Sequence, residues 1–551
     1  MSTIADTEPT GFIAQVPRGA FLGTLVGACS TVLVAQANSS IPATLNGMFQ
    51  TDLRATGDDI TWITSSFMIA VVVFEFTFGV LGDLFGRKRL VLAGTALLLI
   101  GNIVSATAGS PHALWVGAAL NGIGAGAMLP GTLSLAAAVA RSPRSRAKAV
   151  AIWAGFLSAG GGIAPLLGGA FAHYGSWRGA YWVLAGLSLL AIVLTAAFSA
   201  ESSAPEGRKL DIPGQALFAI GLILVLFAAV QGPTDGWSAP RIVVCFVVGA
   251  VLLAVFLAVE ARSDSPILNL DLFKNRAFLV TSVVAVVGMF SFLGVGYALS
   301  IWMGPMQHQD PLRIAVVFVA LQAPTFVLIP VMSRLLHRVS PIWMLAAGFA
   351  LMAAGDYCYV ALDADNTSLA PFITPTVVVG LGFSLALNSM TAVAINSVPL
   401  HLAGMASATI NMIRDLGFAL GPVLIGAVAL SRAGKEFMTS LAGAGLPAPD
   451  VAAATQIGQV GGPLAVNGLP PGTPGSAAHG LALHALSGAY TTAFVVVGTA
   501  AGVAAILTVV GTIGRKSAVS AEPVSQALVD PLHPALDEIP AVDLVADAEP
   551  Q

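Results

Sequence analysis

Gly79-Val-Leu-Gly-Asp83-Leu-Phe-Gly86-Arg87-Lys88-Arg89 ends one long apolar run of this chain and begins the next. A short turn that carries glycine and several basic residues between two apolar runs is typical of the cytoplasmic side of a membrane, where Lys and Arg accumulate. The stretch therefore predicts two membrane-spanning helices joined by a tight cytoplasmic turn.

The composition of the whole chain agrees with a membrane protein. Of its 551 residues, 56% are apolar and only 9% are charged, whereas soluble domains average about 25% charged residues. So few charges cannot cover a surface that faces water. The formal net charge of −4 favours no nucleic-acid partner. Cys29, Cys245 and Cys358 lie inside apolar runs and predict neither a disulfide framework nor a metal site.

Fourteen apolar runs are long enough to cross the membrane, because a helix needs about 20 apolar residues to span the hydrocarbon layer. Backbone groups in lipid must be hydrogen-bonded within the segment, so these runs are predicted to be helices. The expected fold class is an all-α integral membrane protein. The runs lie near residues 20–43, 59–82, 88–108, 112–138, 148–173, 178–199, 212–231, 241–260, 277–303, 312–335, 341–362, 370–397, 403–431 and 485–513.

The distribution of Lys and Arg predicts the orientation of these spans. With the N-terminus in the cytoplasm, 17 of the 24 Lys and Arg residues fall in inside segments and 6 in outside segments, with Arg414 left inside a span. This bias places both termini in the cytoplasm and therefore requires an even number of spans. The expected location is the cell membrane, plasma or inner, with a multi-pass topology in the lipid bilayer.

Two segments do not have the composition of a span. Residues 432–484 are rich in Gly, Pro and Ala, which predicts an outside loop between the last two spans. Residues 514–551 contain acidic residues and prolines without periodicity, which predicts a disordered cytoplasmic tail, either regulatory or simply solvated. The expected organisation is a cytoplasmic tail at 1–19, an N-terminal six-helix half at 20–199, a linker with two extra spans at 200–262 and a C-terminal six-helix half at 263–513.

Two spans echo each other, which indicates an internal repeat. One carries Gly160-Gly-Gly-Ile-Ala-Pro165-Leu-Leu-Gly168-Gly169, and the other carries Gly417-Phe-Ala-Leu-Gly421-Pro422. Glycines give a smooth helix face and proline removes a backbone donor, so these motifs permit a bend and close contact with the opposite half. The alternative interpretation is ordinary packing of small residues.

The chain resembles the fourteen-span drug:proton antiporter family of the major facilitator superfamily over residues 20–513. The resemblance is carried by the opening motif, the Gly160–Gly169 motif, the pair Trp177-Arg178 and the stretch Asn411-Met-Ile-Arg414-Asp-Leu-Gly417. It implies two six-helix halves plus two extra central spans, and export of hydrophobic or cationic small molecules in exchange for protons by alternating access. We expect a monomer without a cofactor that is not an enzyme, because the sequence holds no nucleophile–base pair and no phosphate-binding loop.

The resemblance implies that Asp83 gates the cytoplasmic side by capping the start of a helix in the other half and by pairing with a nearby Arg. A carboxylate at a helix N-terminus is favoured by about 0.3–1 kcal/mol, which biases one conformation without locking it. Gly79, Gly86, Arg87 and Lys88 complete this gating motif. The alternative is that Asp83 and the basic turn only fix the topology.

Four ionisable residues lie well inside predicted spans, away from the span ends: Glu75, Asp356, Arg414 and Asp415. An ionisable group in the middle of a bilayer costs about 2.5–3.5 kcal/mol or more, so each is a candidate for proton and charge coupling. Glu75 and Arg414 lie about 12 and 16 Å from the cytoplasmic side by helix rise, and we expect them to interact across the transport path. The alternatives for Glu75 are a contact to a cationic substrate and a structural role. Asp356 is expected in a solvated outer vestibule.

The chain departs from the family pattern at two positions. Where the family has an acid in span 1 and an Arg in span 4, this sequence has Leu33 and Ala118. Asp415 stands where the family usually has an amide, which adds a second titrating group. Either Glu75 and Asp415 substitute for the missing pair, or the protein is a facilitator without proton drive.

The expected substrate surface is apolar with a few polar points, because aromatic and methionine-rich linings suit varied hydrophobic ligands. Two alternative functions are export of one specific metabolite without standard proton coupling and a non-transport role as a membrane sensor. The candidate cavity residues are Asn38, Trp62, Asn121, Phe292, Tyr297, Gln322, Asn388 and Met390.

Overall fold

The computed structural model describes residues 18–138, 143–203, 210–263, 266, 268–399 and 403–512. Within them, fourteen helices are long and apolar enough to cross a membrane, which confirms the predicted number of spans. All the regular structure in the described residues is helical, so the predicted all-α fold class is also confirmed. The tails expected at either end, apart from Arg18 and Gly19 at the start of the first helix, lie outside the described residues.

The N-terminal half contains seven helices because its first span is broken in two. They are α1 (Arg18–Ser40), α2 (Pro42–Leu53), α3 (Gly57–Phe85), α4 (Arg87–Ala106), α5 (Pro111–Ala138), α6 (Pro143–Tyr174) and α7 (Arg178–Phe198). The two extra spans follow as α8 (Ile212–Asp235) and α9 (Pro240–Glu260).

The C-terminal half repeats the pattern of long helices and adds short helical turns. Its elements are η1 (Leu270–Lys274), α10 (Arg276–Ile301), η2 (Trp302–Met306), α11 (Pro311–Arg338), α12 (Pro341–Cys358), η3 (Tyr359–Ala361), α13 (Ala370–Asn396), α14 (Ala403–Ala442), α15 (Ala448–Asn467), η5 (Ser476–Ala478) and α16 (His479–Thr512).

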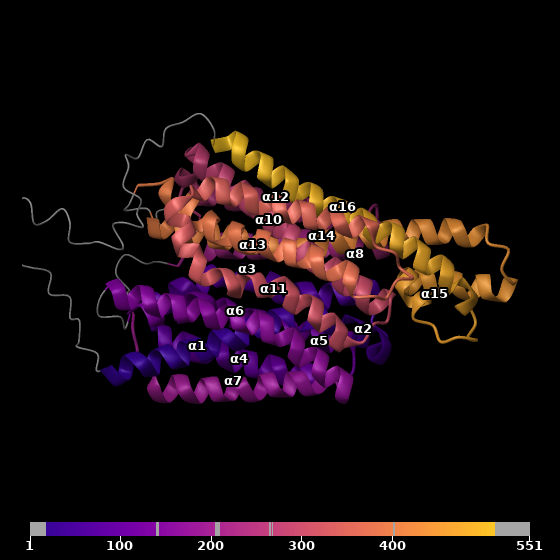
Figure 1. Ribbon diagram of the computed structural model, residues 1–551, viewed down its shortest axis with the longest axis horizontal. Coiled ribbons are helices and arrows are strands. Elements are labelled where there is room, and N and C mark those ends of the chain that lie inside the picture. The colour runs from indigo at the N-terminus through magenta and orange to yellow at the C-terminus, as the bar shows by residue number, and fades with distance from the viewer. Residues whose placement is uncertain are drawn as a thin grey trace, which may run out of the picture.

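The two halves form two layers of roughly parallel helices (Figure 1). The start of α1 and the end of α16 lie at the same end of the bundle, and α15 protrudes from the other end. We call these the Arg87 end, after the basic turn, and the α15 end. An even number of spans requires the first and last spans to have their chain ends at the same end of the bundle.

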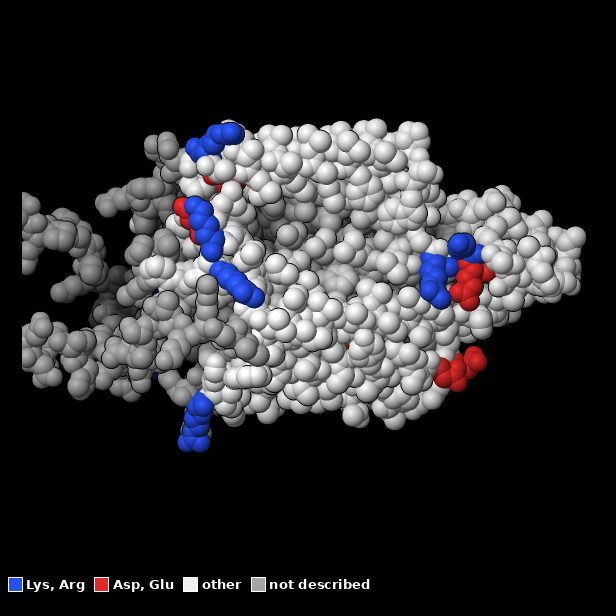
Figure 2. Space-filling model, turned by 90° about the horizontal axis from the view of Figure 1, so that it is seen from above, with Lys and Arg blue, Asp and Glu red and all other residues white. Residues whose placement is uncertain are grey.

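Charged side chains gather near the two ends of the molecule on the face shown in Figure 2, and the broad belt between them is almost entirely white. Large apolar residues are exposed along the spans. On α9, for example, Val244 is 56% and Val247 57% exposed. A helix that presents such residues outward is in its lowest free energy when that face contacts lipid.

Local sequence signals fix where several helices begin. Thr56 caps α3, and Asp59 closes a reciprocal capping box with it. The Asn275 side chain accepts a hydrogen bond from Ala277 N at 2.9 Å at the start of α10. Asp310 accepts one from Leu312 N at 2.8 Å at the start of α11. Each cap satisfies a backbone donor that the first turn of a helix leaves unpaired.

Pro42 breaks the first span into α1 and α2, since proline has no N–H to donate to the preceding turn. The chain passes the break with Ile41 still in a helical conformation, so α2 continues in the same direction to Leu53. The candidate span is Phe21–Ser40, which confirms the predicted run at 20–43. α2 lies outside that span, because it is short and carries polar residues such as Asn46 and Gln50.

The segment 432–484 is a helical lobe, and the expected outside loop is therefore corrected. The end of α14, α15, η5 and the start of α16 pack around a core of their own, formed by Phe437, Leu441, Ala454, Val466, Ala478, Ala482 and Ala485. Much of the Gly and Pro that suggested a loop lies at the ends and breaks of these helices, whereas Gly434 and Gly458 lie inside α14 and α15. Gly462 has a φ of 68° and kinks α15 before Pro463.

Candidate functional site

A cavity of about 220 Å³ lies between the two halves near the middle of the spans. Helices α1, α2, α3, α5 and α6 of the N-terminal half face α10, α11, α13 and α14 across it. Because both halves contribute to its wall, any movement of one half against the other changes its shape and access. Its polar and charged lining residues are Gln36, Ser39, Ser40, Asn46, Thr64, Ser158, Tyr297, Ser300, Gln322, Thr325, Arg414 and Asp415.

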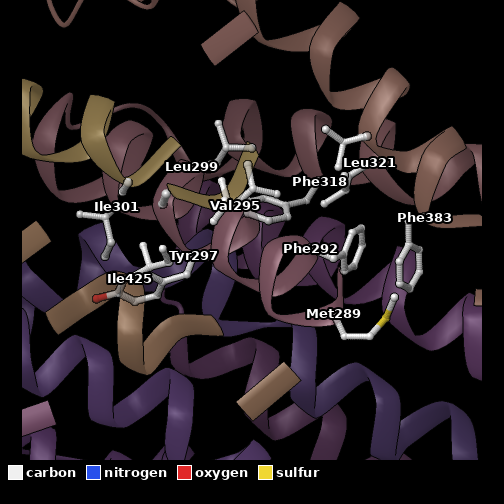
Figure 3. Close-up of a cluster of buried hydrophobic side chains, with 14 of the residues drawn as sticks. Met289, Phe292, Val295, Tyr297, Leu299, Ile301, Phe318, Leu321, Phe383 and Ile425 are labelled. Carbon is white, nitrogen blue, oxygen red and sulfur yellow. The ribbon is translucent and has the colours of Figure 1, made fainter. Parts of the chain in front are cut away.

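Three phenylalanines of the C-terminal half form one wall of the cavity. Phe292 and Phe383 stack face to face, with ring centroids 3.6 Å apart and an interplanar angle of 11°. Figure 3 shows these two rings side by side, with Met289 below Phe383. Phe418 lies 6.4 Å from Phe292 and 6.3 Å from Phe383 between ring centroids. This wall offers flat apolar surface to a ligand.

Two glutamines, one from each half, lie next to a glycine of α6. A Cβ added at Gly161 would lie 3.0 Å from Gln322 Nε2 and 3.6 Å from Gln36 Cγ. Gln36 comes from α1 and Gln322 from α11, so amide groups from the two halves both lie beside Gly161 of α6. They supply hydrogen-bond donors and acceptors beside an otherwise apolar surface.

A cluster of three charged groups lies at the side of the cavity nearer the Arg87 end. Arg414 Nε donates to Asp415 Oδ1 at 2.8 Å, and Arg414 Nη1 donates to Asn411 Oδ1 at 3.1 Å. Glu75 of α3 lies in hydrogen-bonding reach of Asp415 of α14 and in electrostatic contact with Arg414. The expected approach of Glu75 to Arg414 is thus present in the geometry, and Asp415 stands between them.

The two carboxyl groups of this cluster both need a hydrogen-bond donor. In the described part of the chain, Glu75 Oε2 and Asp415 Oδ2 are buried without a hydrogen-bond partner. Two ionised carboxylates are acceptors only and repel each other, whereas one protonated carboxyl donates to the other. Arg414 compensates a single negative charge, so the arrangement is chemically satisfied when the pair holds one proton.

The α15 end of the cavity is closed by hydrogen bonds between the halves. Asn46 Nδ2 donates to Ser300 Oγ at 2.8 Å, and Ser300 Oγ donates to Ala43 O at 2.6 Å. The hydroxyls of Thr61 and Tyr297 lie 2.7 Å apart. Each contact joins a helix of the N-terminal half to α10, so opening this end requires all of them to break.

At the closed end, glycines without a side chain allow the backbones of helices from opposite halves to come into contact. A Cβ added at Gly47 of α2 would lie 3.1 Å from the carbonyl carbon of Gly304, in the π-helical turn η2. A Cβ at Gly169 of α6 would lie 2.7 Å from Pro311 O at the start of α11. Beside this second crossing, His173 Nδ1 and Asp310 Oδ2 pair at 2.5 Å.

The helical lobe contacts both halves above the closed end. Gln50 Nε2 of α2 donates to Leu464 O at 2.7 Å. The Asn467 side chain, 2% exposed, donates to Pro305 O at 2.9 Å and Met306 O at 3.1 Å in η2. The lobe therefore spans the junction of α2 with η2 and adds to the closure.

The basic turn packs against the segment that follows α7. Arg87 donates to Asp83 Oδ1 at 2.8 and 3.0 Å, and the backbone N–H of Lys88 donates to Glu201 Oε1 at 2.9 Å. Gly86 separates α3 from α4 with a φ of 110°, which favours glycine. These partners belong to the N-terminal half, and the predicted cap by Asp83 on a helix of the other half stays a prediction.

Three of the eight predicted cavity residues line the cavity: Phe292, Tyr297 and Gln322. Asn38 and Asn121 are instead buried within the N-terminal half, and Trp62 faces α8, with its ring centroid 5.9 Å from that of Phe227. Met390 is 1% exposed in the core of the C-terminal half, and Asn388 donates to Ser384 O of its own helix at 2.9 Å. The sequence locates these residues in the correct spans, but it does not show which side of a helix faces the cavity.

The predicted inter-half glycines divide into two groups. Gly169 meets α11 of the opposite half, and Pro165 and Pro422 line the cavity. Gly160 and Gly168 instead pack against α1 and its continuation around Ile41, and Gly417 and Gly421 pack against α10, all within their own halves. The motif glycines therefore mainly bring neighbouring helices of one half together.

Asp356 does not lie in a solvated vestibule, which corrects the expectation for this residue. Its side chain is fully buried between α12 and α10, where Ser291 Oγ donates to Asp356 Oδ2 at 2.9 Å. Helix rise gives depth along the membrane but no information on which neighbours enclose a side chain. Asp356 is part of the interior of the C-terminal half, apart from the residues that line the cavity.

Several cavity residues had no distinguishing signal in the sequence. Phe383 and Phe418 resemble every other phenylalanine in an apolar run. Asn46 lies beyond the predicted end of the first span, and Thr64 is one of several hydroxyl residues in α3. A weak signal exists for Asn46, since a buried asparagine needs a specific partner and the residue follows a proline break.

Two helical halves that enclose a cavity at mid-membrane, with one end closed by contacts between them, define a membrane transporter of the alternating-access class. The chain belongs to the Major Facilitator Superfamily, whose family model matches residues 27–422. This confirms the resemblance seen in the sequence motifs. The protein is a multi-pass membrane protein.

Named relatives of the chain are drug resistance and export proteins. The multidrug resistance protein Stp of Mycobacterium tuberculosis is 27% identical over 375 residues, which cover 68% of this chain and 70% of that protein. The tetracenomycin C resistance and export protein of Streptomyces glaucescens is 27% identical over 519 residues, covering 92% and 95%. The multidrug efflux pump LfrA of Mycolicibacterium smegmatis is 26% identical over 431 residues, covering 78% and 84%.

Solved structures support the fold. A bacterial homologue of the human lysosomal transporter Spinster has a TM-score of 0.59 at 16% identity, covering 91% of this chain and all of that one. The nucleoside transporter NupG has a TM-score of 0.57 at 12% identity, covering 90% and 100%. At these identities the similarity concerns the arrangement of the helices alone.

Proposed function

We propose that the protein exports hydrophobic small molecules in exchange for protons. The observation that carries this proposal is the meeting of Glu75 and Asp415, one from each half, beside Arg414 and the substrate cavity. A proton held between groups on opposite halves is gained or lost as the halves move. Movement and proton transfer are thereby linked at one place.

The proposed exchange of substrate for protons depends on how the net charge of the cluster changes when the halves move. With the halves in contact at Glu75 and Asp415, one proton and Arg414 together leave the cluster without net charge, which suits a low-dielectric site. When the two carboxyls separate and water enters, both ionise and the cluster gains a negative charge. A substrate that reaches the cavity then interacts with a different electrostatic field from the one it meets in the protonated state.

The orientation rests on the Lys and Arg bias, which places the Arg87 end in the cytoplasm. On that basis the structure is closed toward the outside, by the contacts at the α15 end, and the lobe lies outside. We propose the cell membrane as its location and a monomer as its working unit. One buried apolar core runs through both halves, and the cavity is complete within one chain.

The cavity favours substrates with flat apolar surface and a few polar groups. The stacked pair of Phe292 and Phe383 supports binding of aromatic rings, and Gln36 and Gln322 support hydrogen bonds. The volume of about 220 Å³ is smaller than the roughly 300–1,000 Å³ of drug-sized pockets. The halves must therefore part further at the Arg87 end to admit a drug-sized molecule.

The test is uptake of a fluorescent aromatic substrate into inverted vesicles that hold the protein. A pH gradient with an acidic lumen is expected to drive uptake, because protons leave the lumen as substrate enters it. A gradient with an alkaline lumen is the reversed control, and a protonophore is expected to abolish the uptake. Uptake at a rate that does not depend on the pH gradient would identify a facilitator and reject the exchange of protons. Vesicles without the protein serve as the matched control for passive leak.

Export of one specific metabolite is the second candidate. It is favoured by the relative that spans nearly the whole chain, which is named for resistance to and export of a single compound, tetracenomycin C. Growth of expressing cells against a panel of dyes, antiseptics and polycyclic phenols separates the two candidates. Protection against one structural class alone supports the narrow exporter.

A further inference from the structure

The extra span α8 covers the seam where α3 of the N-terminal half meets α14 of the C-terminal half. Nine residues of the three helices form one buried apolar cluster: Ile69, Val72 and Val73 of α3, Leu222, Leu226, Ala229 and Val230 of α8, and Ala419 and Val423 of α14. Ala419 and Val423 are fully buried. Without α8, this part of the seam would face lipid.

Hydrogen bonds tie the two ends of α8 to opposite halves. Near its start, the Gln215 amide donates to the backbone carbonyl of Val73 in α3. Just beyond its end, Trp237 Nε1 donates to Ser431 Oγ of α14 at 3.0 Å. α8 thus bridges the seam and does not belong to one half alone.

The first turns of α8 lie at the level of the carboxyl pair. α8 runs antiparallel to α3, with Phe227 against Trp62 and Gln215 against Val73. Glu75 follows Val73 by two residues and therefore lies level with the beginning of α8. On α14, Leu416 directly follows Asp415 and packs in the same cluster as Phe218 of α8.

We propose that α8 forms the lipid-side wall of the Glu75–Asp415 site and that Gln215 is a positioning residue which holds α3 against that wall. The inference rests on the proposed proton exchange at this pair for its functional meaning. An ionisable pair on a moving seam must be shielded from lipid at every stage, and a bridging helix supplies that shield. Gln215 acts through the backbone of α3, two residues from Glu75.

The charged groups around the pair are few. Arg414 contacts Asp415 on α14, and α3 contributes Glu75 itself. At the start of α8, Asp211 caps the first turn by accepting from Gly214 N at 2.9 Å, and the buried Glu260 of α9 lies beside the same glycine. A change at Gln215 therefore leaves the charges of the site in place and alters only how α3 sits against α8.

Reaction with dicyclohexylcarbodiimide tests the wall, because this apolar reagent enters lipid and modifies protonated carboxyl groups. The full chain in proteoliposomes is treated, and mass spectrometry measures modification of the peptide that holds Glu75. We expect slow modification in the unsubstituted protein and a several-fold increase in Phe218→Ala and Gln215→Leu. Ile220→Ala, at a residue of α8 that is 52% exposed, is the matched control and should leave the rate of Glu75 modification unchanged.

Equal rates of Glu75 modification in the unsubstituted protein and in both variants would overturn the proposal that α8 shields the carboxyl pair from lipid. Modification of Asp356, enclosed by α10 and α12 away from α8, serves as an internal reference, so a general loss of folding is recognised by a rise at both sites. A rise at Glu75 alone supports the proposal.

The pH profile of transport tests the positioning role. Gln215→Leu is expected to shift the pH at which transport is half-maximal, whereas Trp237→Phe, which removes the hydrogen bond at the other end of α8, should leave it unchanged. An unshifted profile in Gln215→Leu would overturn the role of Gln215. If the unsubstituted protein shows no proton-driven transport, the proposed function fails instead, and the modification experiment still decides on the wall.

Discussion

Glu75 of α3 and Asp415 of α14 come from opposite halves of the protein and lie in hydrogen-bonding reach of each other beside Arg414. Such a contact exists only while the two halves are together at this height. The proposed exchange of protons assigns to this contact the link between proton transfer and movement, in a chain that has Leu33 where the family has an acid.

Removal of the Glu75 carboxyl is expected to abolish coupling. Glu75→Gln keeps the size and the hydrogen-bonding capacity but cannot ionise, so proton-driven uptake should fall by about tenfold or more, equivalent to about 1.4 kcal/mol. Uptake assays in inverted vesicles measure the change. Asp271→Asn, at a side chain that is 73% exposed, is the control for loss of a carboxylate, and a normal rate in Glu75→Gln would reject the carrier role.

Removal of the Asp415 carboxyl is expected to harm stability as well as transport. Asp415→Asn removes the carboxylate that the 23% exposed Arg414 side chain contacts at 2.8 Å and leaves Glu75 as the remaining acid near it. We therefore expect a cost toward the lower end of the roughly 3–5 kcal/mol for breaking a buried pair. The thermal unfolding temperature in detergent should fall further for Asp415→Asn than for Glu75→Gln. The reverse order would show that Arg414 does not depend on Asp415.

Substitution of Gly47 tests the closure of the α15 end. Gly47→Leu places a side chain against Gly304, where even a Cβ would lie 3.1 Å from backbone, so we expect the end to stay open. A cysteine at Ser300 should then react faster with a water-soluble maleimide from the α15 side. Gly109→Leu, at a position with open space around it, is the control, and equal reactivity in both would contradict the closure.

Substitution of Asn467 tests the docking of the lobe. Asn467→Ala removes two hydrogen bonds to the carbonyls of η2 and leaves those acceptors without a donor, at a cost of about 1–3 kcal/mol. Limited proteolysis should cut the lobe faster, between α14 and α15. Thr473→Ala, in the exposed turn of the same lobe, should leave the rate unchanged.

Acidic pH is expected to loosen the same docking. Burial of the ring against the lobe lowers the pKa of His308 below its ordinary value of 6.5, although part of the side chain stays in water. The docked state therefore prefers the neutral imidazole, and docking keeps its full strength above pH 6.5 and weakens as the pH falls below it. His479 also lies nearby and opposes protonation of His308.

Hydrogen exchange of α15 measures this effect. After correction for intrinsic rates, protection should be lower at pH 5.5 than at pH 7.5, and His308→Gln should reduce the difference. Asp310, the other charged group in this turn, is paired with His173, so His173→Gln serves to separate its contribution. Equal protection at both pH values would contradict the prediction.

The sequence predicted the spans well and the sides of the helices poorly. Glu75, Arg414 and Asp415 stood out because an ionisable residue in an apolar run is costly wherever it points. Trp62 and Asn388 were assigned to the cavity, whereas Trp62 faces α8 and Asn388 bonds within its own helix. In a membrane helix, lipid and neighbouring helices are equally apolar, so hydropathy does not distinguish the face that lines a cavity.

The lobe at 432–484 shows the same limit for a segment outside the membrane. Its Gly, Pro and Ala content suggested a loop, but Phe437, Leu441 and Val466 form a small core that holds two helices together. Helix propensity is weak for such a composition, and the gain comes from tertiary packing. Only the folded structure could show it.

The sequence by itself determined that this chain is a fourteen-span helical membrane protein with a repeated half, because the cost of leaving backbone groups and charges in lipid permits few alternatives. The tertiary structure decided which side chains meet. It brought Glu75 to Asp415, closed the end where Gly47 crosses Gly304, and placed α8 over the seam. These contacts depend on the rotation and packing of whole helices against one another, which the pattern of residues along one chain does not specify.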